Sequence, residues 1–249
     1  MIFRALYYGE GLFETIKWLG ENYKLTKHYQ RLKRSAEFFG YPYPSYEEFL
    51  NKIIEATGNN RNLYVKFLLL YSGSDYYGDF PDSYKTDVIV KPLPETPKSV
   101  KLCISDMRRH SKNPIFYHKT TNYLFNVLVK RKAKKRGFFD GIVLNEKDLI
   151  TETSSANILI YKGGKFITPA RESGLLWGTT IDIIREDLNI SEEKIDCNLL
   201  YSADYVFILN SIVEIVPVEE IEGKKYRVDN LLLSEIKEII EKKSNSNTR

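Results

Sequence analysis

Alternating hydrophobic and polar positions in the N-terminal part of the chain predict strands, and a longer spacing between them predicts helices. Residues 12–18 alternate, which is typical of a half-buried strand, and the polar turn after them predicts a return strand over residues 23–26. From His28 to Phe39 the core-facing positions recur every three or four residues, as on one face of a helix. A second helix is expected from the cap residue Ser45 to Gly58.

Two more strand-like runs, residues 63–71 and 86–91, lead into a segment that fits neither a helix nor a central strand. Residues 92–97 contain three prolines, and proline lacks the backbone N–H that both structures use. We therefore expect a linker over residues 92–97. It would separate an N-terminal domain, residues 1–94, from a C-terminal domain, residues 98–249.

The second half of the chain shows the same mixture of spacings. Strands are expected near residues 100–105, 205–209 and 214–218, hairpin turns at 145–148 and 162–164, and helices over 122–136, after Gly178 and over 230–243. Because strands and helices are interspersed in both halves, the pattern predicts an α/β (α+β) protein.

The composition is that of a globular protein with a core of its own. Of the 249 residues, 43% are hydrophobic and 28% are charged, close to the globular average. No apolar run reaches the length of a membrane span, and the first residues lack the apolar stretch of a secretion signal, so a cytoplasmic protein is expected. Cys103 and Cys197 are far apart and the histidines lack zinc-protease spacing, so we expect neither a disulfide nor a metal site.

A basic run at residues 130–136 raises the possibility of a nucleic-acid-binding module. Six of its seven residues are Lys or Arg, and a helix carrying them would present positive charge on most faces. The same run is also typical of the solvated C-terminal turns of a helix, where cations complement the helix dipole. The net charge of +4 is small, so we favour the solvated helix over a nucleic-acid partner.

Three polar segments are candidates for chemistry, and each has an ordinary structural explanation beside the functional one. Residues 178–180 open an expected helix with Gly-Thr-Thr, which suits a phosphate but is also a common helix cap. Glu152 stands between two apolar runs, either in a polar turn or as a buried carboxylate that needs partners. Lys119 precedes an expected helix, either as a surface lysine or as a desolvated amine suited to covalent catalysis.

The order and spacing of these segments resemble the fold-type IV pyridoxal-phosphate enzymes, also called class IV aminotransferases. The resemblance runs nearly end to end through five motifs, at residues 8–16, 28–32, 119–124, 140–157 and 168–180. It implies two domains, a smaller N-terminal α/β domain and a larger, barrel-like C-terminal domain. It also implies a homodimer and the cofactor pyridoxal 5′-phosphate.

The resemblance assigns a role to each candidate residue. Lys119 would carry the cofactor covalently and then act as general acid and base, while Glu152 would pair with the ring nitrogen and keep it protonated. Arg31 would grip the phosphate. The remaining cofactor contacts implied are Thr179 and Thr180 at the phosphate and Ser155 and Asn157 as secondary contacts.

Within the family, the sequence is most similar to the 4-amino-4-deoxychorismate lyases, which form p-aminobenzoate and pyruvate in folate biosynthesis. Thr15 stands where these lyases have a threonine that assists proton delivery, and Lys66 matches a lysine that contacts a substrate carboxylate. Phe13 and Tyr76 are further expected substrate contacts. The alternative is an aminotransferase acting on branched-chain or D-amino acids, which would use the same Lys119, Glu152 and Arg31.

The N-terminus departs from the family pattern. Only eight residues precede Gly9, so an edge strand of the first sheet is expected to be missing or replaced. The aromatic loop over residues 71–80 is the expected contact with a second copy of the chain.

Overall fold

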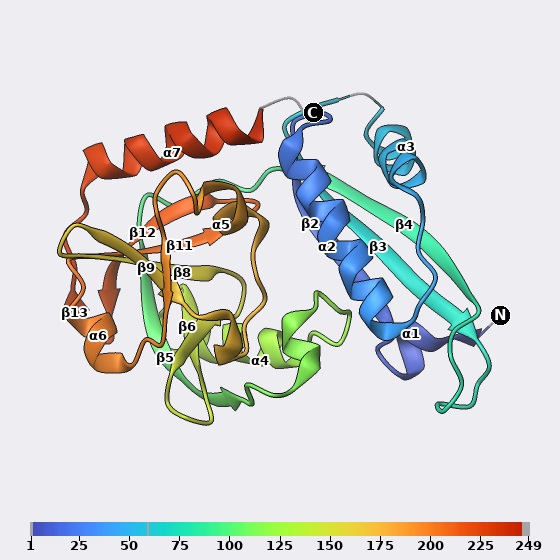
Figure 1. Ribbon diagram of the computed structural model, residues 1–249, viewed down its shortest axis with the longest axis horizontal. Helices are drawn as coiled ribbons and strands as arrows, with labels where there is room; N and C mark the ends of the chain where they lie inside the picture. Colours follow the sequence, from blue (N-terminus) through green and yellow to red (C-terminus); the bar gives the residue numbers. More distant parts are fainter. Residues whose placement is uncertain (1, 59, 246–249) are drawn as a thin grey trace. The chain divides into compact units, whose positions relative to one another are not determined.

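The computed structural model describes residues 2–58 and 60–245, and these divide into two compact units (Figure 1). Unit 1 holds the described residues up to Pro94 together with His118–Tyr123 and Asn245. Unit 2 holds Glu95–Tyr117 and Leu124–Ser244. The short segment that carries Lys119 therefore belongs to the N-terminal unit although residues of unit 2 precede it in the sequence. The outer ends expected for the two domains, residues 1 and 249, lie outside the described residues.

Unit 1 is an antiparallel sheet with two helices on one face (Figure 1). Its elements are β1 (Ile2–Phe3), α1 (Arg4–Tyr7), β2 (Gly11–Trp18), α2 (Tyr23–Phe39), α3 (Tyr46–Thr57), β3 (Leu63–Gly73) and β4 (Ser83–Pro92). β3 pairs with β2 along one edge and with β4 along the other. Alternate residues of β3, from Val65 to Tyr71, are fully buried against the helices, as the period of two predicts.

The return strand expected over residues 23–26 is wrong, because α2 begins there. The side chain of Asn22 accepts a hydrogen bond from the backbone N–H of Leu25 at 2.9 Å, and this cap starts the helix at Tyr23. The capping bond satisfies a helix N–H that a hairpin would have left to its partner strand.

The N-terminal edge strand is replaced by a very short one. β1 pairs antiparallel with the end of β3, Ile2 opposite Gly73 and Phe3 opposite Ser72. The first residues of the chain thus still extend the sheet of unit 1, over two residues only.

Unit 2 is built on a nine-stranded mixed sheet in the order β10-β9-β8-β11-β12-β5-β6-β7, with β13 beside β12. Its strands are β5 (Val100–Arg109), β6 (Asp140–Asn145), β7 (Ile150–Thr153), β8 (Asn157–Lys162), β9 (Lys165–Pro169), β10 (Ser191–Glu193), β11 (Tyr205–Asn210), β12 (Glu214–Ile221) and β13 (Lys224–Lys225). Its helices are α4 (Leu124–Lys135), α5 (Thr179–Ile184), α6 (Cys197–Tyr201) and α7 (Asn230–Ser244), with 3₁₀ turns at Pro114–Tyr117 and Arg171–Ser173.

This sheet curls around a single apolar core. Buried aliphatic side chains from strands far apart in the sheet order, such as Ile142 of β6, Ile160 of β8 and Val216 of β12, belong to one contiguous cluster. α4 packs on β5 and β6, and α7 packs on β12 (Figure 1). The mixed α/β class and the barrel-like second domain expected from the sequence are confirmed. Within the described residues, none of the helices combines the length and apolar composition that a membrane crossing requires.

Candidate active site

Lys119 lies on a short extended segment that is hydrogen-bonded to the edge of β2 in unit 1. The backbone N–H of Phe13 donates to the carbonyl of Lys119 at 3.0 Å, and the N–H of Thr121 donates to the carbonyl of Gly11 at 2.8 Å. Gly11 is required at this crossing, because a Cβ there would lie 2.7 Å from the Thr121 hydroxyl oxygen. The backbone of Lys119 is therefore fixed by the sheet.

The ring of Phe13 contacts two lysine ammonium groups. The Nζ of Lys119 lies 4.5 Å from the ring centroid and the Nζ of Lys66 lies 4.4 Å from it, both within cation–π range. Thr15 lies directly opposite Lys66 in the β2–β3 register. Burial, with the charge of Lys91 adding to it, lowers the pKa of Lys66. Phe13, Thr15 and Lys66 thus share the sheet face opposite to the helices.

Arg31 is held by a buried carboxylate that the sequence analysis did not single out. Glu14 accepts hydrogen bonds from Nε of Arg31 at 2.9 Å and from Nη2 at 2.5 Å, and its Oε2 also lies 2.6 Å from Nδ1 of His28. Burial would raise the pKa of Glu14, but the charge and hydrogen bonds of Arg31, with His28 adding to them, lower it to about 2. Burial lowers the pKa of His28 to about 4, so this histidine is neutral at pH 7.

Tyr76 lies in an exposed aromatic loop of unit 1. Its side chain is 58% exposed and packs against Tyr77 at a centroid distance of 5.0 Å. The fully buried guanidinium of Arg4 connects this loop to the rest of unit 1. It donates hydrogen bonds to the carboxylate of Glu10 and to the backbone carbonyls of Ser74, Tyr76, Tyr77 and Asp79. The loop is therefore an ordered part of unit 1 despite its exposed rings.

Glu152 is buried on β7 of unit 2 and is held by one of its two oxygens. Oε1 accepts hydrogen bonds from Nη1 of Arg109 at 2.5 Å and from the backbone N–H of Leu176 at 3.1 Å. Glu152 is 7% exposed and Arg109 is 3% exposed. Among the described residues no hydrogen bond to Oε2 is formed, so this oxygen can accept one from a bound group.

The turn before α5 is shaped by a close contact between Gly178 and Asn157. A Cβ at Gly178 would lie 2.0 Å from Oδ1 of Asn157, so no larger residue fits. The Nδ2 of Asn157 donates to the carbonyl of Leu176 at 2.8 Å. Glycine thus lets the backbone at the start of α5 approach a neighbouring group closely.

The two threonines after this turn differ in their partners. The hydroxyl oxygens of Thr179 and Ser211 are 3.0 Å apart. The Thr180 hydroxyl is buried, and within the described ranges it has no hydrogen-bond partner. A buried hydroxyl without a partner is costly, and a phosphate oxygen is an acceptor that would satisfy it.

Ser155 uses its hydroxyl inside unit 2. Its Oγ donates to Oδ2 of Asp140 at 2.8 Å, and the same carboxylate oxygen lies 3.5 Å from the Nζ of Lys130. The proton of the Ser155 hydroxyl is therefore engaged by Asp140, and its oxygen can still accept a hydrogen bond from a bound group.

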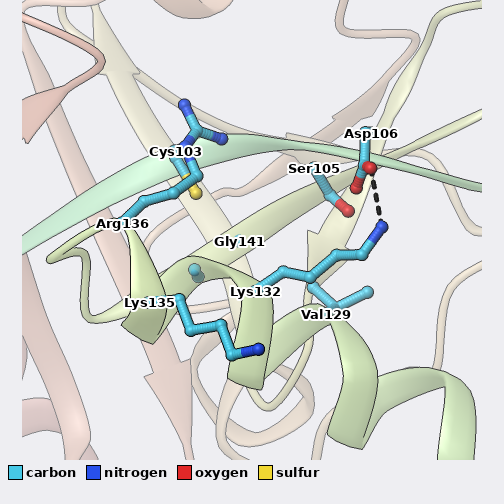
Figure 2. A pocket seen from close by; sticks show the side chains of 9 residues that line it. Cys103, Ser105, Asp106, Val129, Lys132, Lys135, Arg136 and Gly141 are labelled. Atoms are coloured by element: carbon cyan, nitrogen blue, oxygen red, sulfur yellow. Dashed lines mark hydrogen bonds and ion pairs between the residues drawn. The ribbon is translucent and has the colours of Figure 1, made fainter.

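A cavity of about 340 Å³ in unit 2 is lined by none of these candidates (Figure 2). Cys103 and Gly141 contribute to its wall, and the ion pair of Lys132 with Asp106, at 2.6 Å, lies beside it. Arg136, another lining residue, pairs with Glu222 at 2.7 Å. Carboxylates thus partner part of the basic run at residues 130–136, as expected for a solvated helix face.

The structure groups the candidates as two sets. Unit 1 contains Lys119, Phe13, Thr15, Lys66 and Arg31. Unit 2 contains Glu152 and the residues of the turn before α5, Gly178, Thr179 and Thr180. Three contributors were missed from the sequence: Glu14, Arg109 and Ser211. Glu14 lies inside the motif at residues 8–16, which gave a local signal, whereas Arg109 and Ser211 gave none.

The residues present fit pyridoxal phosphate by the chemistry of their donors. The group needs an amine for its aldehyde, cations and N–H or O–H donors for its phosphate, and a carboxylate for its ring nitrogen. In unit 1, Lys119 supplies the amine and Arg31 supplies a cation for the phosphate. In unit 2, the unpartnered hydroxyl of Thr180 supplies an O–H donor for the phosphate, and the Oε2 of Glu152 supplies the carboxylate oxygen.

Comparisons with known proteins point the same way. The model of the amino-transferase class IV family matches residues 11–221. A protein from Methanocaldococcus jannaschii, provisionally named a branched-chain-amino-acid aminotransferase, is 28% identical over 96% of this chain and 87% of its own. A protein from Schizosaccharomyces pombe, provisionally named an aminodeoxychorismate lyase, is 28% identical over 80% of this chain and 85% of its own.

Solved structures share the fold. One from Legionella pneumophila, provisionally titled a 4-amino-4-deoxychorismate lyase, superposes with a TM-score of 0.89 at 23% identity and covers 96% of this chain and 93% of its own. Structures with this fold have also been solved with pyridoxal phosphate bound.

Proposed function

The chain belongs to the class IV aminotransferase family, whose cofactor is pyridoxal 5′-phosphate, and we propose that it is a lyase within that family. The proposed reaction converts 4-amino-4-deoxychorismate to p-aminobenzoate and pyruvate. The observation that carries this proposal is the pairing of Thr15 with Lys66 across β2 and β3, with the Phe13 ring contacting the ammonium groups of both Lys66 and Lys119. The hydroxyl proposed for proton delivery and the cation proposed to bind a substrate carboxylate thus belong to the sheet to which the Lys119 segment is hydrogen-bonded.

Each cofactor contact is assigned to a residue of this chain. Lys119 would bind the aldehyde and Arg31, held by Glu14, would bind the phosphate. The remaining proposed contacts are Thr179 and Thr180 at the phosphate, Glu152 at the ring nitrogen, and Ser155 and Asn157 around the turn. When bound, the cofactor supplies an electron sink for the pair of electrons released by breaking a C–H bond.

The side chains of unit 1 would perform the proton transfers. The amine of Lys119 would take the proton from the ring carbon that bears the substrate amine. The C–O bond to the enolpyruvyl group then breaks, the ring becomes aromatic, and the enolpyruvate receives a proton to leave as pyruvate. The Thr15 hydroxyl would deliver that proton, and Lys66 would hold a substrate carboxylate. Phe13 would pack against the substrate. Tyr76 is proposed as a further substrate contact, and the loop that carries it is also proposed to contact a second copy of the chain.

Half-burial of Lys66 supports its assignment to a substrate carboxylate. Its side chain is half-buried and its ammonium group contacts a ring, and among the described residues no carboxylate is paired with it. A desolvated cation without a counter-ion is costly. A bound carboxylate would supply the missing charge.

A homodimer is proposed from an exposed apolar surface on unit 1, here called the aromatic patch: Leu6, Tyr7, Tyr76, Tyr77 and Phe80. Arg4 donates hydrogen bonds to three backbone carbonyls of the loop beneath it. Large exposed apolar groups on an ordered surface are typical of protein interfaces. We place the protein in the cytoplasm, where its two free cysteines would stay reduced.

An aminotransferase is the second candidate, because relatives named as branched-chain aminotransferases match most of the chain. It would use Lys119, Glu152 and Arg31 in the same roles, and it would return the amino group to a keto acid. Unlike the lyase, it needs a second substrate and has no need of the Thr15 hydroxyl.

The two candidates are separated by supplying the holoenzyme with 4-amino-4-deoxychorismate and no keto acid. Fluorescent p-aminobenzoate together with pyruvate supports the lyase. A panel of branched-chain and D-amino acids with 2-oxoglutarate serves as the second arm, and glutamate formation there without aminobenzoate in the first arm would move the assignment to aminotransferase. Thr15→Val should lose most lyase turnover while Thr15→Ser, which keeps the hydroxyl, retains it, with the cofactor bound in both variants.

A further inference from the structure

Arg109, the last residue of β5, makes the shortest contact of Glu152, and none of the roles above uses it. We propose that Arg109 is a positioning residue that fixes the Glu152 carboxylate for the ring nitrogen of the cofactor. The inference rests on the proposed role of Glu152.

The contacts of Glu152 fix the orientation of its carboxylate. Arg109 and the N–H of Leu176 both donate to Oε1, at 2.5 and 3.1 Å. Two donors on one oxygen set the plane of the group and leave Oε2 as the acceptor for a further donor. The protonated ring nitrogen of pyridoxal phosphate is a donor of that kind.

Arg109 is itself held on several sides, so it can act as a fixed reference for Glu152. Its guanidinium carbon lies 4.7 Å from the ring centroid of Phe116 and 5.5 Å from that of Phe125. Its Nη1 also donates to the carbonyl of Gly174 at 3.3 Å. With 3% of the residue exposed, the cation is shielded from water, which strengthens its attraction for the carboxylate.

The cost of burying Arg109 argues that it serves the site. Its Nε is buried, and in the part of the chain that the structure describes it has no hydrogen-bond partner. Buried ion pairs add little stability compared with apolar side chains of the same volume. This arginine leaves one N–H unsatisfied and pairs with the carboxylate of the site. It is therefore better explained by orienting that carboxylate than by stabilising the fold.

Loss of Arg109 would leave Glu152 as an uncompensated buried charge. The carboxylate would then turn toward another donor, and its Oε2 would no longer be held as the acceptor for the ring nitrogen. The effect should therefore depend on the ring nitrogen and not on the phosphate or the aldehyde of the cofactor.

The test compares two cofactors in binding titrations of the apoenzyme. One is pyridoxal phosphate, and the other is its 1-deaza analogue, which has the same aldehyde and phosphate but a C–H in place of the ring nitrogen. In the parent protein, pyridoxal phosphate should bind more tightly. Arg109→Met should weaken pyridoxal phosphate about tenfold or more, the loss typical of a hydrogen bond to a charged group, and should leave the affinity for the analogue unchanged. Arg108→Met is the matched control, because Arg108 is the neighbouring arginine in the sequence and pairs with the exposed Asp148. Both affinities should stay at the parent values in this variant.

Glu152→Gln separates failure of this inference from failure of the proposed function. If Glu152→Gln and Arg109→Met both lose the preference for pyridoxal phosphate, both assignments stand. If Glu152→Gln keeps the preference, Glu152 does not meet the ring nitrogen and the proposed role of that residue fails. If Glu152→Gln loses it but Arg109→Met keeps it, or weakens both cofactors equally, only the inference is overturned. Should Arg109→Met not fold, Arg109→Gln carries the same test, because it removes the charge and keeps a polar donor.

Discussion

Replacing Glu14 by Gln should destabilise unit 1 more than any comparable surface change. The substitution keeps the size of the side chain and removes the charge that faces the buried Arg31 and His28. The guanidinium of Arg31 would remain buried without its carboxylate. Breaking a buried ion pair by removing one partner is costly for this reason.

The expected magnitude follows from the pKa of Glu14. Its value falls from the usual 4.5 to about 2 in the folded protein, a difference that corresponds to about 3 kcal/mol at ~1.4 kcal/mol per unit. A carboxyl group with a lowered folded pKa stabilises the fold fully above pH 4.5, and this stabilisation is lost as the pH falls toward 2. At pH 7.5 we therefore expect Glu14→Gln to lower the free energy of unfolding by about 3 kcal/mol, in line with the cost of a broken buried pair.

Urea unfolding followed by tryptophan fluorescence measures this change in unit 1 alone. Trp18 is buried in the core of unit 1, and the second tryptophan, Trp177, lies in unit 2. A Trp177→Phe background therefore reports only on Trp18. Glu55→Gln serves as control, because Glu55 forms an exposed pair with Lys52 at 2.9 Å, and such pairs contribute at most ~1 kcal/mol. An unfolding free energy for Glu14→Gln equal to that of the control would show that the buried pair contributes no more than an exposed one.

Three further changes test other parts of the structure. As the pH falls from 6.5 to about 4, the parent should lose stability, because burial lowers the pKa of His28 to about 4 and only the unfolded chain takes up the proton. His28→Gln should make the urea midpoint less dependent on pH over this range. An unchanged pH dependence would show that burial does not lower the pKa of His28. Gly178→Ala should weaken pyridoxal phosphate binding about tenfold, because the Cβ of the alanine would lie 2.0 Å from Asn157 Oδ1. Adding Asn157→Ala should restore part of the binding. A fluorescence titration that finds no loss of affinity in the single variant would show that this close contact does not affect cofactor binding. Arg4→Lys should raise amide hydrogen exchange over residues 74–79, because lysine cannot replace the planar fork that donates to four loop carbonyls; equal exchange in parent and variant would show that the loop is ordered by other contacts.

Local patterns in the sequence predicted most elements of the fold, but not the cap at Asn22. Alternation located β2 and β3, and the threefold to fourfold spacing located α2. The strand expected over residues 23–26 was wrong, because a single side-chain bond from Asn22 decided in favour of the helix. Helix capping of this kind depends on one residue, which periodicity does not register.

The partners of the candidate residues were harder to predict than the residues themselves. Motif spacing indicated Lys119, Glu152 and Arg31, and it did not indicate that Glu14 binds Arg31 or that Arg109 binds Glu152. The two members of each pair are 17 and 43 positions apart in the sequence. Such pairs are set by strand register and tertiary packing, so they become visible only when the sheets are formed.

The covalent bond between Lys119 and pyridoxal phosphate is tested by locating the bound cofactor on the chain. Purified protein would be incubated with pyridoxal phosphate, reduced with borohydride, digested, and analysed by mass spectrometry. A single phosphopyridoxyl group is expected on the amine of Lys119, and none in Lys119→Ala. Labelling of Lys66 or another lysine in place of Lys119, or no labelling at all, would contradict this expectation.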